Sequence, residues 1–269
     1  MAIDSKLVEL NTRKQDIKNE LSAIGHDMTN VPFSDYASLV NEKVKGMLDR
    51  SITSIKIPDG VTEIGMYAFY ACGELENIEI PNSVTTIGSG ALLACAISAV
   101  NIPNGVKTIG VEAFAYCSNL VTVDIPNSVT FMGDRAFEEC TSLGSVLIGN
   151  SIRTIGDYTF ANCESLGYIN IPNNVKSIGD YAFANCDLGN GGAGIGDGVT
   201  SIGNHAFEYC QPLQEVFIGS SVTTIGDYAF YECRNITDVY YNGTEAQWNS
   251  INIGVGNEAL TLASFHFQG

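Results

Sequence analysis

The chain has 269 residues and a formal net charge of −17 at pH 7. An acidic surface repels phosphate groups, which argues against nucleic acid and anionic membranes as partners. Apolar residues make up 45 % of the chain and charged residues 16 %, so a long core is possible and disorder is not indicated. No apolar run reaches the roughly 18 residues that a membrane-spanning helix needs, so we expect no membrane insertion.

The first residues, MAIDSKLVELNTRKQ, lack the apolar stretch of a signal peptide. We therefore expect synthesis in the cytoplasm. From there the protein either stays in a reducing compartment or leaves by a route without a cleaved signal. Display on a virus particle and attachment to the cell surface by another route are both open.

Residues 1–25 are predicted to form a helix with a heptad seam. Leucine or lysine occupies the a positions and mostly isoleucine the d positions, which favours three or four strands over two. We expect a homo-oligomer, with a trimer favoured. The alternative is an amphipathic helix that packs on its own chain. The seam residues are Ile3, Leu7, Leu10, Lys14, Ile17, Leu21 and Ile24.

Residues 26–50 are predicted to contain a turn and a second helix. Ser34 has the character of an N-cap, and apolar residues in 35–48 fall on one helical face. A stack of repeats needs its open end covered, because that end exposes core side chains and unpaired strand edges. We expect this helix to be an N-terminal cap or a short stalk.

Residues 51–243 are built from a repeat of about 23 residues. A fixed period of this size predicts stacked supersecondary units, here a solenoid of about eight coils. Each repeat reads as a short strand closed by proline, an Ile-Gly corner, and an Ala-Phe-x-x-Cys segment predicted to be one helical or 3₁₀ turn with phenylalanine inside. The fold class is thus an α/β repeat solenoid. One cysteine marks each repeat: Cys72, Cys95, Cys117, Cys140, Cys163, Cys186, Cys210 and Cys233.

The eight cysteines are predicted to form a reduced ladder inside the core. Equivalent positions in adjacent coils lie about 5 Å apart, near the strand spacing, so distance alone leaves disulfides open. Buried free cysteine is a common small hydrophobe, which favours thiols. Zinc sites need clustered ligands, whereas no two cysteines here are closer than 22 residues and the chain has three histidines. We expect no metal site and no cofactor.

The repeat L-x-x-I-x-I-P-x-x-V-x-x-I-G-x-x-A-F-x-x-C resembles the BspA-like leucine-rich repeats over residues 52–243. Residues 244–269 are similar to the terminal segment of such proteins, with Trp248 and Phe265 expected to close the last coil. The resemblance implies a leucine-rich repeat fold and a role in attachment at the cell surface.

A second, shorter resemblance lies at the N-terminus. Residues 15–40 resemble the N-terminal segments of some phage or prophage tail proteins. This resemblance implies a trimeric receptor-binding protein displayed on a tail. The alternatives are a structural particle component and a cell-surface adhesin without a tail.

Two coils depart from the repeat. The second coil is one residue short after Cys95. In residues 187–198, DLGNGGAGIGDG, Asn190 occupies the register of leucine and Ala193 replaces an isoleucine, so we expect a loose or kinked stack. The glycines also match the GxGxxG pattern of nucleotide-binding proteins, but no long helix follows them, so a weakened repeat is the better interpretation.

No constellation of residues predicts catalysis. The cysteines are expected in the core, the three histidines lie in different regions, and His205 is expected to be a solvated surface residue. Aspartates recur in the turn after Ile-Gly, where local turn stabilisation explains them better than a calcium site. We expect a protein that is not an enzyme. These aspartates are Asp134, Asp157, Asp180 and Asp227.

The outward-facing strand positions remain as the candidate binding surface. The slot between the two strand isoleucines is polar in the first half of the stack and carries apolar residues in the second half. Exposed aromatic side chains on a rigid sheet favour recognition of a protein or glycan receptor. The alternatives are that these residues only suit strands or are covered by the C-terminal cap. The candidate residues are Leu147, Tyr168, Phe217 and Tyr240.

Overall fold

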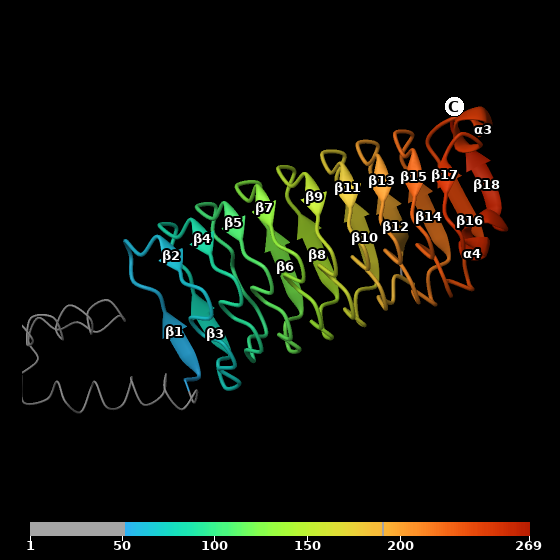
Figure 1. Cartoon of the computed structure of the whole chain (residues 1–269). Helices are drawn as coiled ribbons and strands as arrows, with labels where there is room; N and C mark the ends of the chain where they lie inside the picture. The colour runs from blue at the N-terminus through green and yellow to red at the C-terminus, as the bar shows by residue number, and fades with distance from the viewer. Residues whose placement is uncertain (1–51, 190) are drawn as a thin grey trace, which may run out of the picture.

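The computed structural model describes residues 52–189 and 191–269. They form one elongated solenoid of about nine turns, stacked in chain order (Figure 1). The predicted helices of residues 1–50 and the heptad seam lie outside the described residues, so the oligomer and the N-terminal cap stay predictions. Within the described ranges, no helix is both long and apolar enough to cross a membrane.

The longer strands form one side of the solenoid (Figure 1). They pair in parallel within three successive sheets, β1-β3, β6-β8 and β10-β12-β14-β16-β18. Side chains alternate between buried and outward positions, as the period of two predicts. We call the outward side of these strands the strand face. The strands are β1 (Ser54–Lys56), β3 (Asn77–Glu79), β6 (Thr122–Ile125), β8 (Ser145–Ile148), β10 (Tyr168–Ile171), β12 (Gly192–Ile195), β14 (Glu215–Ile218), β16 (Asp238–Tyr241) and β18 (Ser264–Phe267).

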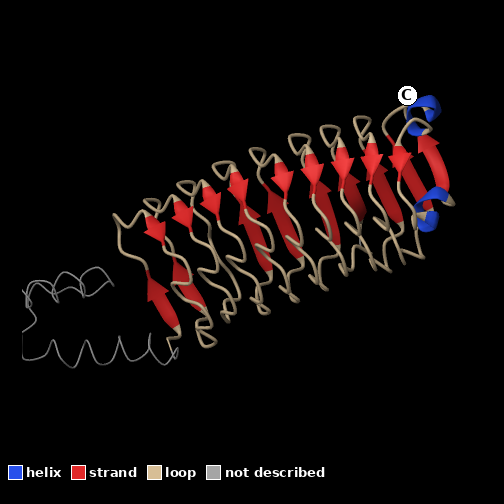
Figure 2. Cartoon of the chain, in the orientation of Figure 1, coloured by secondary structure: helices blue, strands red, loops and turns tan. Residues whose placement is uncertain are grey.

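Short strands after the proline turn line the opposite side of each coil (Figure 2). Each of them has two residues, of which the second is an inward isoleucine or methionine. The strands are β2 (Glu63–Ile64), β4 (Thr86–Ile87), β5 (Thr108–Ile109), β7 (Phe131–Met132), β9 (Thr154–Ile155), β11 (Ser177–Ile178), β13 (Ser201–Ile202), β15 (Thr224–Ile225) and β17 (Asn252–Ile253).

The Ala-Phe-x-x-Cys segments are consecutive turns, not the helical or 3₁₀ turn predicted. In the coil of Phe160, Tyr158 and Asn162 have positive φ angles of 55° and 59°, which interrupts any helix. The N–H groups of Tyr158, Phe160 and Asn162 donate to carbonyls of the next coil at 2.8 to 2.9 Å. The N–H groups of Ala161 and Cys163 close single turns onto the carbonyls three residues earlier, at 3.1 and 3.3 Å. The prediction was wrong because every other N–H group bonds to the next coil, so no continuous helix forms.

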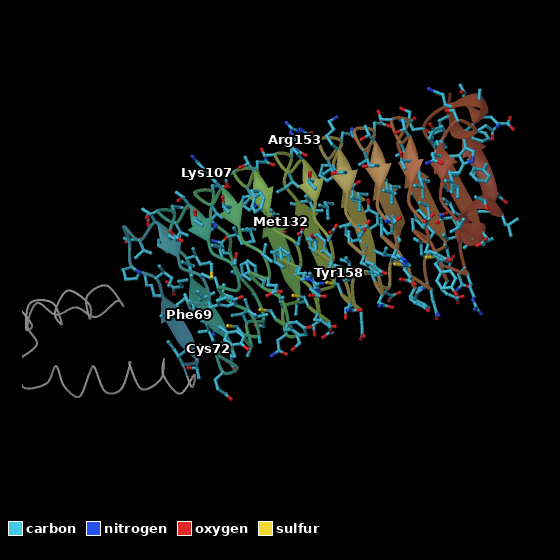
Figure 3. All side chains as sticks on the ribbon, viewed as in Figure 1. Phe69, Cys72, Lys107, Met132, Arg153 and Tyr158 are labelled. Carbon is cyan, nitrogen blue, oxygen red and sulfur yellow. The ribbon has the colours of Figure 1, made fainter. Side chains whose placement is uncertain are left out.

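The core is a stack of similar layers between the two sides (Figure 3). Six phenylalanines are fully buried, and successive rings lie nearly parallel at 5.1 to 5.5 Å between centroids. All eight cysteines are free and buried. Burial raises the pKa of the Cys140 thiol to about 12, which keeps it protonated. The stacked rings are those of Phe114, Phe137, Phe160, Phe183, Phe207 and Phe230.

The two irregular coils behave differently from each other. In the short second coil only an isolated bridge joins Ala99 to Thr122, so the strand face is interrupted there, as expected. Around residues 187–198 the expected loose stack is wrong, because β12 pairs with both β10 and β14 in unbroken register. Leu188 is fully buried, and its N–H donates to the carbonyl of Leu166 at 2.7 Å. A leucine earlier in the segment thus fills the core layer.

The C-terminal residues continue the stack and close it. Strand β18 pairs in parallel with β16. Two short helices, α3 (Glu245–Trp248) and α4 (Glu258–Thr261), flank it (Figure 2). The rings of Trp248 and Phe265 pack 4.8 Å apart against the last core layer, as predicted.

Candidate functional site

Three aromatic rings form a row on the strand face near the C-terminal end. Phe217 on β14 is in register with Tyr240 on β16, which is in register with His266 on β18. The ring centroids lie 4.7 Å and 4.5 Å apart, with interplanar angles of 10° and 16°. We call these three residues the ring row.

His266 extends the candidate site beyond the residues predicted from the sequence. Its Nε2 donates to Oδ1 of Asp238 at 2.7 Å, which anchors the imidazole beside Tyr240. This hydrogen bond lowers the pKa of the Asp238 carboxyl from its ordinary value. The signal in the sequence was the alternation in SFHF, which marks residues 264–267 as one more strand.

The four predicted residues do not form one cluster. Phe217 and Tyr240 stack on each other, whereas Leu147 on β8 and Tyr168 on β10 lie on the other side of β12. Three of them are exposed, with 63 % of Leu147, 46 % of Tyr168 and 38 % of Phe217 accessible. Tyr240 is half-buried, because the ring of His266 stacks on it. The cap therefore extends the strand face and covers it only at Tyr240.

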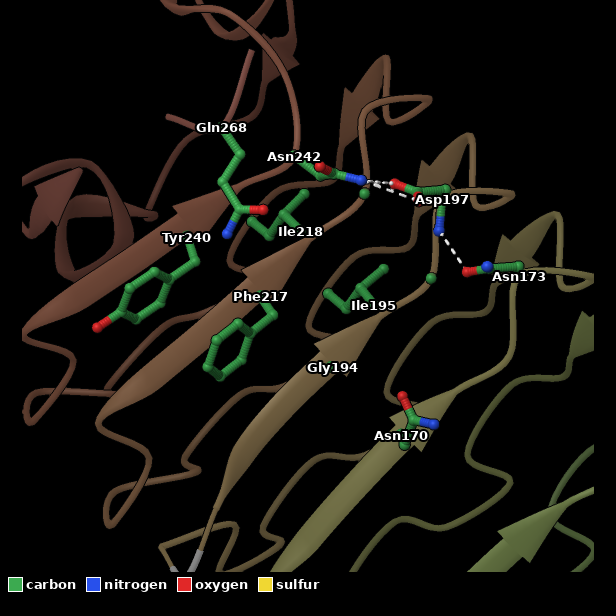
Figure 4. A pocket seen from close by; sticks show the side chains of 12 residues that line it. Asn170, Asn173, Gly194, Ile195, Asp197, Phe217, Ile218, Tyr240, Asn242 and Gln268 are labelled. Carbon is green, nitrogen blue, oxygen red and sulfur yellow. Dashed lines mark hydrogen bonds between the residues drawn. The ribbon is translucent and has the colours of Figure 1, made fainter. Parts of the chain in front are cut away.

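A depression of about 200 Å³ lies around Gly194 on β12, between the pair Phe217 and Tyr240 and the pair Leu147 and Tyr168 (Figure 4). Gly194 is in register with Asn170 on one side and Phe217 on the other. Because glycine has no side chain, one position in the outward row is vacant. The lining residues are Asn170, Asn173, Gly194, Ile195, Gly196, Asp197, Phe217, Ile218, Gly219, Tyr240, Asn242 and Gln268.

The depression continues along the solenoid towards the N-terminus. A second hollow of about 790 Å³ shares Asn170 and Asn173 with it. A third hollow of about 360 Å³ shares Asn104 and Asp124 with the second. Carboxamide side chains recur in all three hollows, so we call the three together the carboxamide groove. Its carboxamide residues are Asn82, Asn101, Asn104, Asn127, Asn150, Asn170, Asn173, Asn174, Asn242 and Gln268.

Hydrogen bonds between coils hold one wall of this groove. Asn173 Oδ1 accepts from the backbone N–H of Asp197 at 2.9 Å. Oδ1 of Asp197 accepts from the N–H of Ser220 at 3.1 Å and from Nδ2 of Asn242 at 2.8 Å (Figure 4). The wall is therefore set by the stack and not by a flexible loop.

The turn aspartates act between coils and not within their own turn. Oδ1 of Asp157 accepts from the backbone N–H of Asp180 at 2.8 Å, and Asn204 does the same for Asp227 at 2.9 Å. We predicted that these aspartates stabilise their own turn; this was wrong, because they accept hydrogen bonds from the next coil. Among the described residues, no cluster of three or more histidine, cysteine, aspartate or glutamate side chains is placed to hold a metal ion.

His205 is also not the solvated residue predicted. Its ring stacks between those of Tyr181 and Tyr228, with centroid distances of 4.5 Å and 5.2 Å. Its Nδ1 lies 2.9 Å from Oε2 of Glu208. Tyr158 (Figure 3) stacks on Tyr181 and extends this row along the turn edge. The row is explained by packing of equivalent positions in adjacent coils.

Comparison with known proteins identifies relatives of the repeat. The family model described as BspA type leucine rich repeat region matches residues 47–166 and 134–252, in six copies. A leucine-rich repeat protein from Bacteroides ovatus is 34 % identical, with a TM-score of 0.68. The match covers 78 % of this chain and 53 % of that protein, so the chain spans about half of its length.

Two further solved structures are similar at lower identity. A leucine rich cell surface protein from Faecalibacterium prausnitzii is 24 % identical over 77 % of this chain and 64 % of its own, with a TM-score of 0.41. A leucine-rich repeat protein from Eubacterium ventriosum is 17 % identical over 77 % of this chain and 74 % of its own, with a TM-score of 0.44. No curated protein matches the chain.

Proposed function

Since the chain belongs to the BspA-type leucine-rich repeat family, we propose that it is a noncatalytic adhesion or receptor-binding protein that contacts its receptor through the strand face. Repeat proteins of this family are scaffolds consistent with protein binding or adhesion. Solenoids present extended, rigid surfaces of this kind. The receptor is a protein or a glycan.

The ring row is the observation that carries the proposal. Phe217 and Tyr240 lie on paired strands, and their backbones are held on both sides by neighbouring strands. Rigid aromatic side chains provide a large contact area and lose little conformational entropy on binding, so they dominate many interfaces. The net charge of −17 favours a neutral or cationic receptor surface.

The proposal is tested by binding of the fluorescently labelled full chain to candidate host cells. Phe217→Ala and Tyr240→Ala each remove one ring and are expected to weaken binding by about tenfold or more. Phe131→Ala is the matched control, because Phe131 is exposed on the short strand β7, away from the strand face. If all three variants bound cells as strongly as the parent protein, the strand face would not be the receptor site.

The second part of the proposal concerns display. The heptad seam of residues 1–25 forms a trimer, which multiplies weak solenoid contacts by avidity. The resemblance of residues 15–40 to tail proteins supports assembly on a phage or prophage tail. Residues 26–50 form a cap or stalk between the seam and the solenoid of residues 51–243, which residues 244–269 close.

Light scattering of the full chain measures its mass in solution. A trimer that becomes a monomer on deletion of residues 1–25 is the expected result. A monomeric full chain would overturn the display model and favour a cell-surface adhesin without a tail. Co-sedimentation with particles, without any cell binding, would favour a structural particle component.

A further inference from the structure

The vacant position at Gly194 has the dimensions of a slot for one ring. Asn170 and Phe217 flank it in register, one strand away on each side. Two strand spacings separate their backbones by about 10 Å, which accommodates a ring at van der Waals distances of about 3.5–4.0 Å from each wall. Tyr240 covers the far face of Phe217 at 4.7 Å, so the near face is turned towards the slot (Figure 4).

The two walls of the slot have complementary chemistry. The face of an aromatic ring carries negative charge density, which suits the C–H groups of a flat-lying sugar ring. A carboxamide both donates and accepts hydrogen bonds, as a sugar hydroxyl requires. Among the described residues, the carboxamides of Asn170 and Gln268 make no hydrogen bond, so both are available to a ligand. Asn170 flanks the slot, and Gln268 lines the same depression beyond Tyr240 (Figure 4).

The charge of the groove selects among glycans. Asp124 and Asp197 are the acidic residues that line the three hollows, and no lysine or arginine among the described residues lines them. An anionic glycan such as a uronate or sulfated polymer would meet like charge without compensation. A neutral chain meets mainly carboxamides.

The pairing of the strands argues against an extended peptide in the same groove. Peptides that bind along a sheet add to a free edge, where backbone N–H and C=O groups are unpaired. Strands β12 and β14, which carry Gly194 and Phe217, are paired on both sides within a five-stranded sheet, so they offer no such edge. Strand β10 is the end strand of that sheet, and β8 lies beside it. The groove offers side chains, in a line that follows the axis of the solenoid.

From these observations we infer that the carboxamide groove binds a neutral glycan chain, with one sugar ring in the Gly194 slot against Phe217. The inference rests on the proposed function and names the chemical class of its receptor. Hollows that share lining residues allow successive sugars of one chain to occupy successive coils.

Affinity electrophoresis of the full chain in native gels tests the inference. The neutral probes are dextran, mannan, galactomannan and soluble N-acetylglucosamine oligomers, and the anionic probes are hyaluronan and heparin. At least one neutral probe is expected to retard the protein, and the anionic probes are expected not to. No retardation by any neutral probe would overturn the inference, as would retardation by the anionic probes alone.

A filling substitution tests the slot itself. Gly194 lies in strand β12, and a Cβ there would lie 3.1 Å from Oδ1 of Asn170. This close contact is to the end of an exposed side chain, which can rotate away, and the next nearest atom is at 3.6 Å, so Gly194→Thr is expected to fold. The added side chain occupies the slot and is expected to weaken glycan binding by about tenfold or more.

Gly144→Thr is the matched control for this substitution. Gly144 is exposed, lies outside the three hollows, and its Cβ would find its nearest neighbour at 3.7 Å. We expect glycan binding by Gly144→Thr to equal that of the parent protein. If a folded Gly194→Thr variant bound glycan as strongly as the parent protein, the inference that a sugar ring occupies the slot would be overturned.

Pretreatment of host cells separates this inference from the proposed function. Periodate cleaves the vicinal diols of sugars, whereas protease removes surface proteins. We expect periodate to abolish cell binding. Cell binding that survives periodate, is lost after protease and still depends on Phe217 would overturn the glycan inference and leave the strand face as a protein-binding site.

Discussion

The Sγ atom of Cys163 lies 3.3 Å from the carbonyl oxygen of Phe137, in the preceding coil. The same contact recurs along the stack, for example between Cys140 and Phe114 at 3.2 Å. Each thiol from Cys95 to Cys233 donates to such a carbonyl in the preceding coil. The carbonyl also accepts the N–H of the cysteine in its own coil, as Phe137 does from Cys140 at 3.3 Å, so the thiol adds a second hydrogen bond that crosses between coils. The cysteine ladder is therefore a structural link between coils.

The first prediction is that these thiols are unreactive in the folded protein. Burial raises the pKa of Cys95, Cys140 and Cys186 to about 12, so the nucleophilic thiolate is almost absent at neutral pH. A colourless aromatic disulfide reagent that releases a coloured thiolate is expected to react slowly with the folded protein. In denaturant it should react with all eight thiols. Rapid reaction under native conditions would contradict the buried ladder.

The second prediction concerns the phenylalanine stack. Phe160→Ala removes a fully buried ring that lies between those of Phe137 and Phe183. The cavity is expected to lower the free energy of unfolding by about 3–5 kcal/mol. Phe131→Ala, at an exposed position, is expected to stay within about 0.5 kcal/mol of the parent protein. Denaturant titration followed by circular dichroism measures both, and equal effects would show that the core layers do not carry the stability.

The third prediction concerns the aspartates that join neighbouring coils. Asp157→Ala removes the acceptor for the backbone N–H of Asp180 and is expected to cost about 0.5–1.5 kcal/mol. Asp157→Asn keeps an acceptor oxygen, as Asn204 does in its own coil, and is expected to cost less. Thermal unfolding of the two variants checks the order. If the asparagine variant were the less stable, the carboxylate charge would matter more than the hydrogen bond.

The fourth prediction is a titration. Because the hydrogen bond from His266 favours the charged carboxylate, the pKa of Asp238 is lowered from its ordinary value of 3.8. The contribution of this pair to stability is present above that ordinary value and is lost as the pH falls through the lowered pKa.

Carboxyl ¹³C NMR is expected to show the Asp238 midpoint below 3.8 in the parent protein. In His266→Ala the midpoint should rise towards the ordinary value. An unchanged midpoint in that variant would show that another group sets the pKa.

Most of the solenoid was predictable because each coil needs similar side chains in the core and at the corners. Almost every coil places a phenylalanine in the core, with Leu92 in that position in the second coil, and each places a glycine at the corner. The same residue types therefore recur at the same spacing. Gly110 illustrates the corner, since a Cβ there would clash with the backbone nitrogen of Ser89 in the preceding coil. Such requirements are visible in one sequence because neighbouring coils are near copies.

The irregular parts were less predictable. The period placed Asn190 in the leucine slot, whereas Leu188 is the buried leucine of that coil. The backbone there has an unusual path, with a positive φ of 45° at Leu188. A register count assumes equal paths in all coils, so it fails where a coil gains a residue.

The sequence by itself determined the period, the inward positions and the outward-facing rings of Phe217 and Tyr240. Only the tertiary structure decided that His266 joins those rings, because the path of the cap between β16 and β18 does not follow the repeat. It also decided that Gly194 leaves a slot, because a slot depends on the side chains that flank it in register. The core and corner positions can be read from each repeat alone. A binding surface, in contrast, consists of side chains from different coils, which come together only when the coils stack.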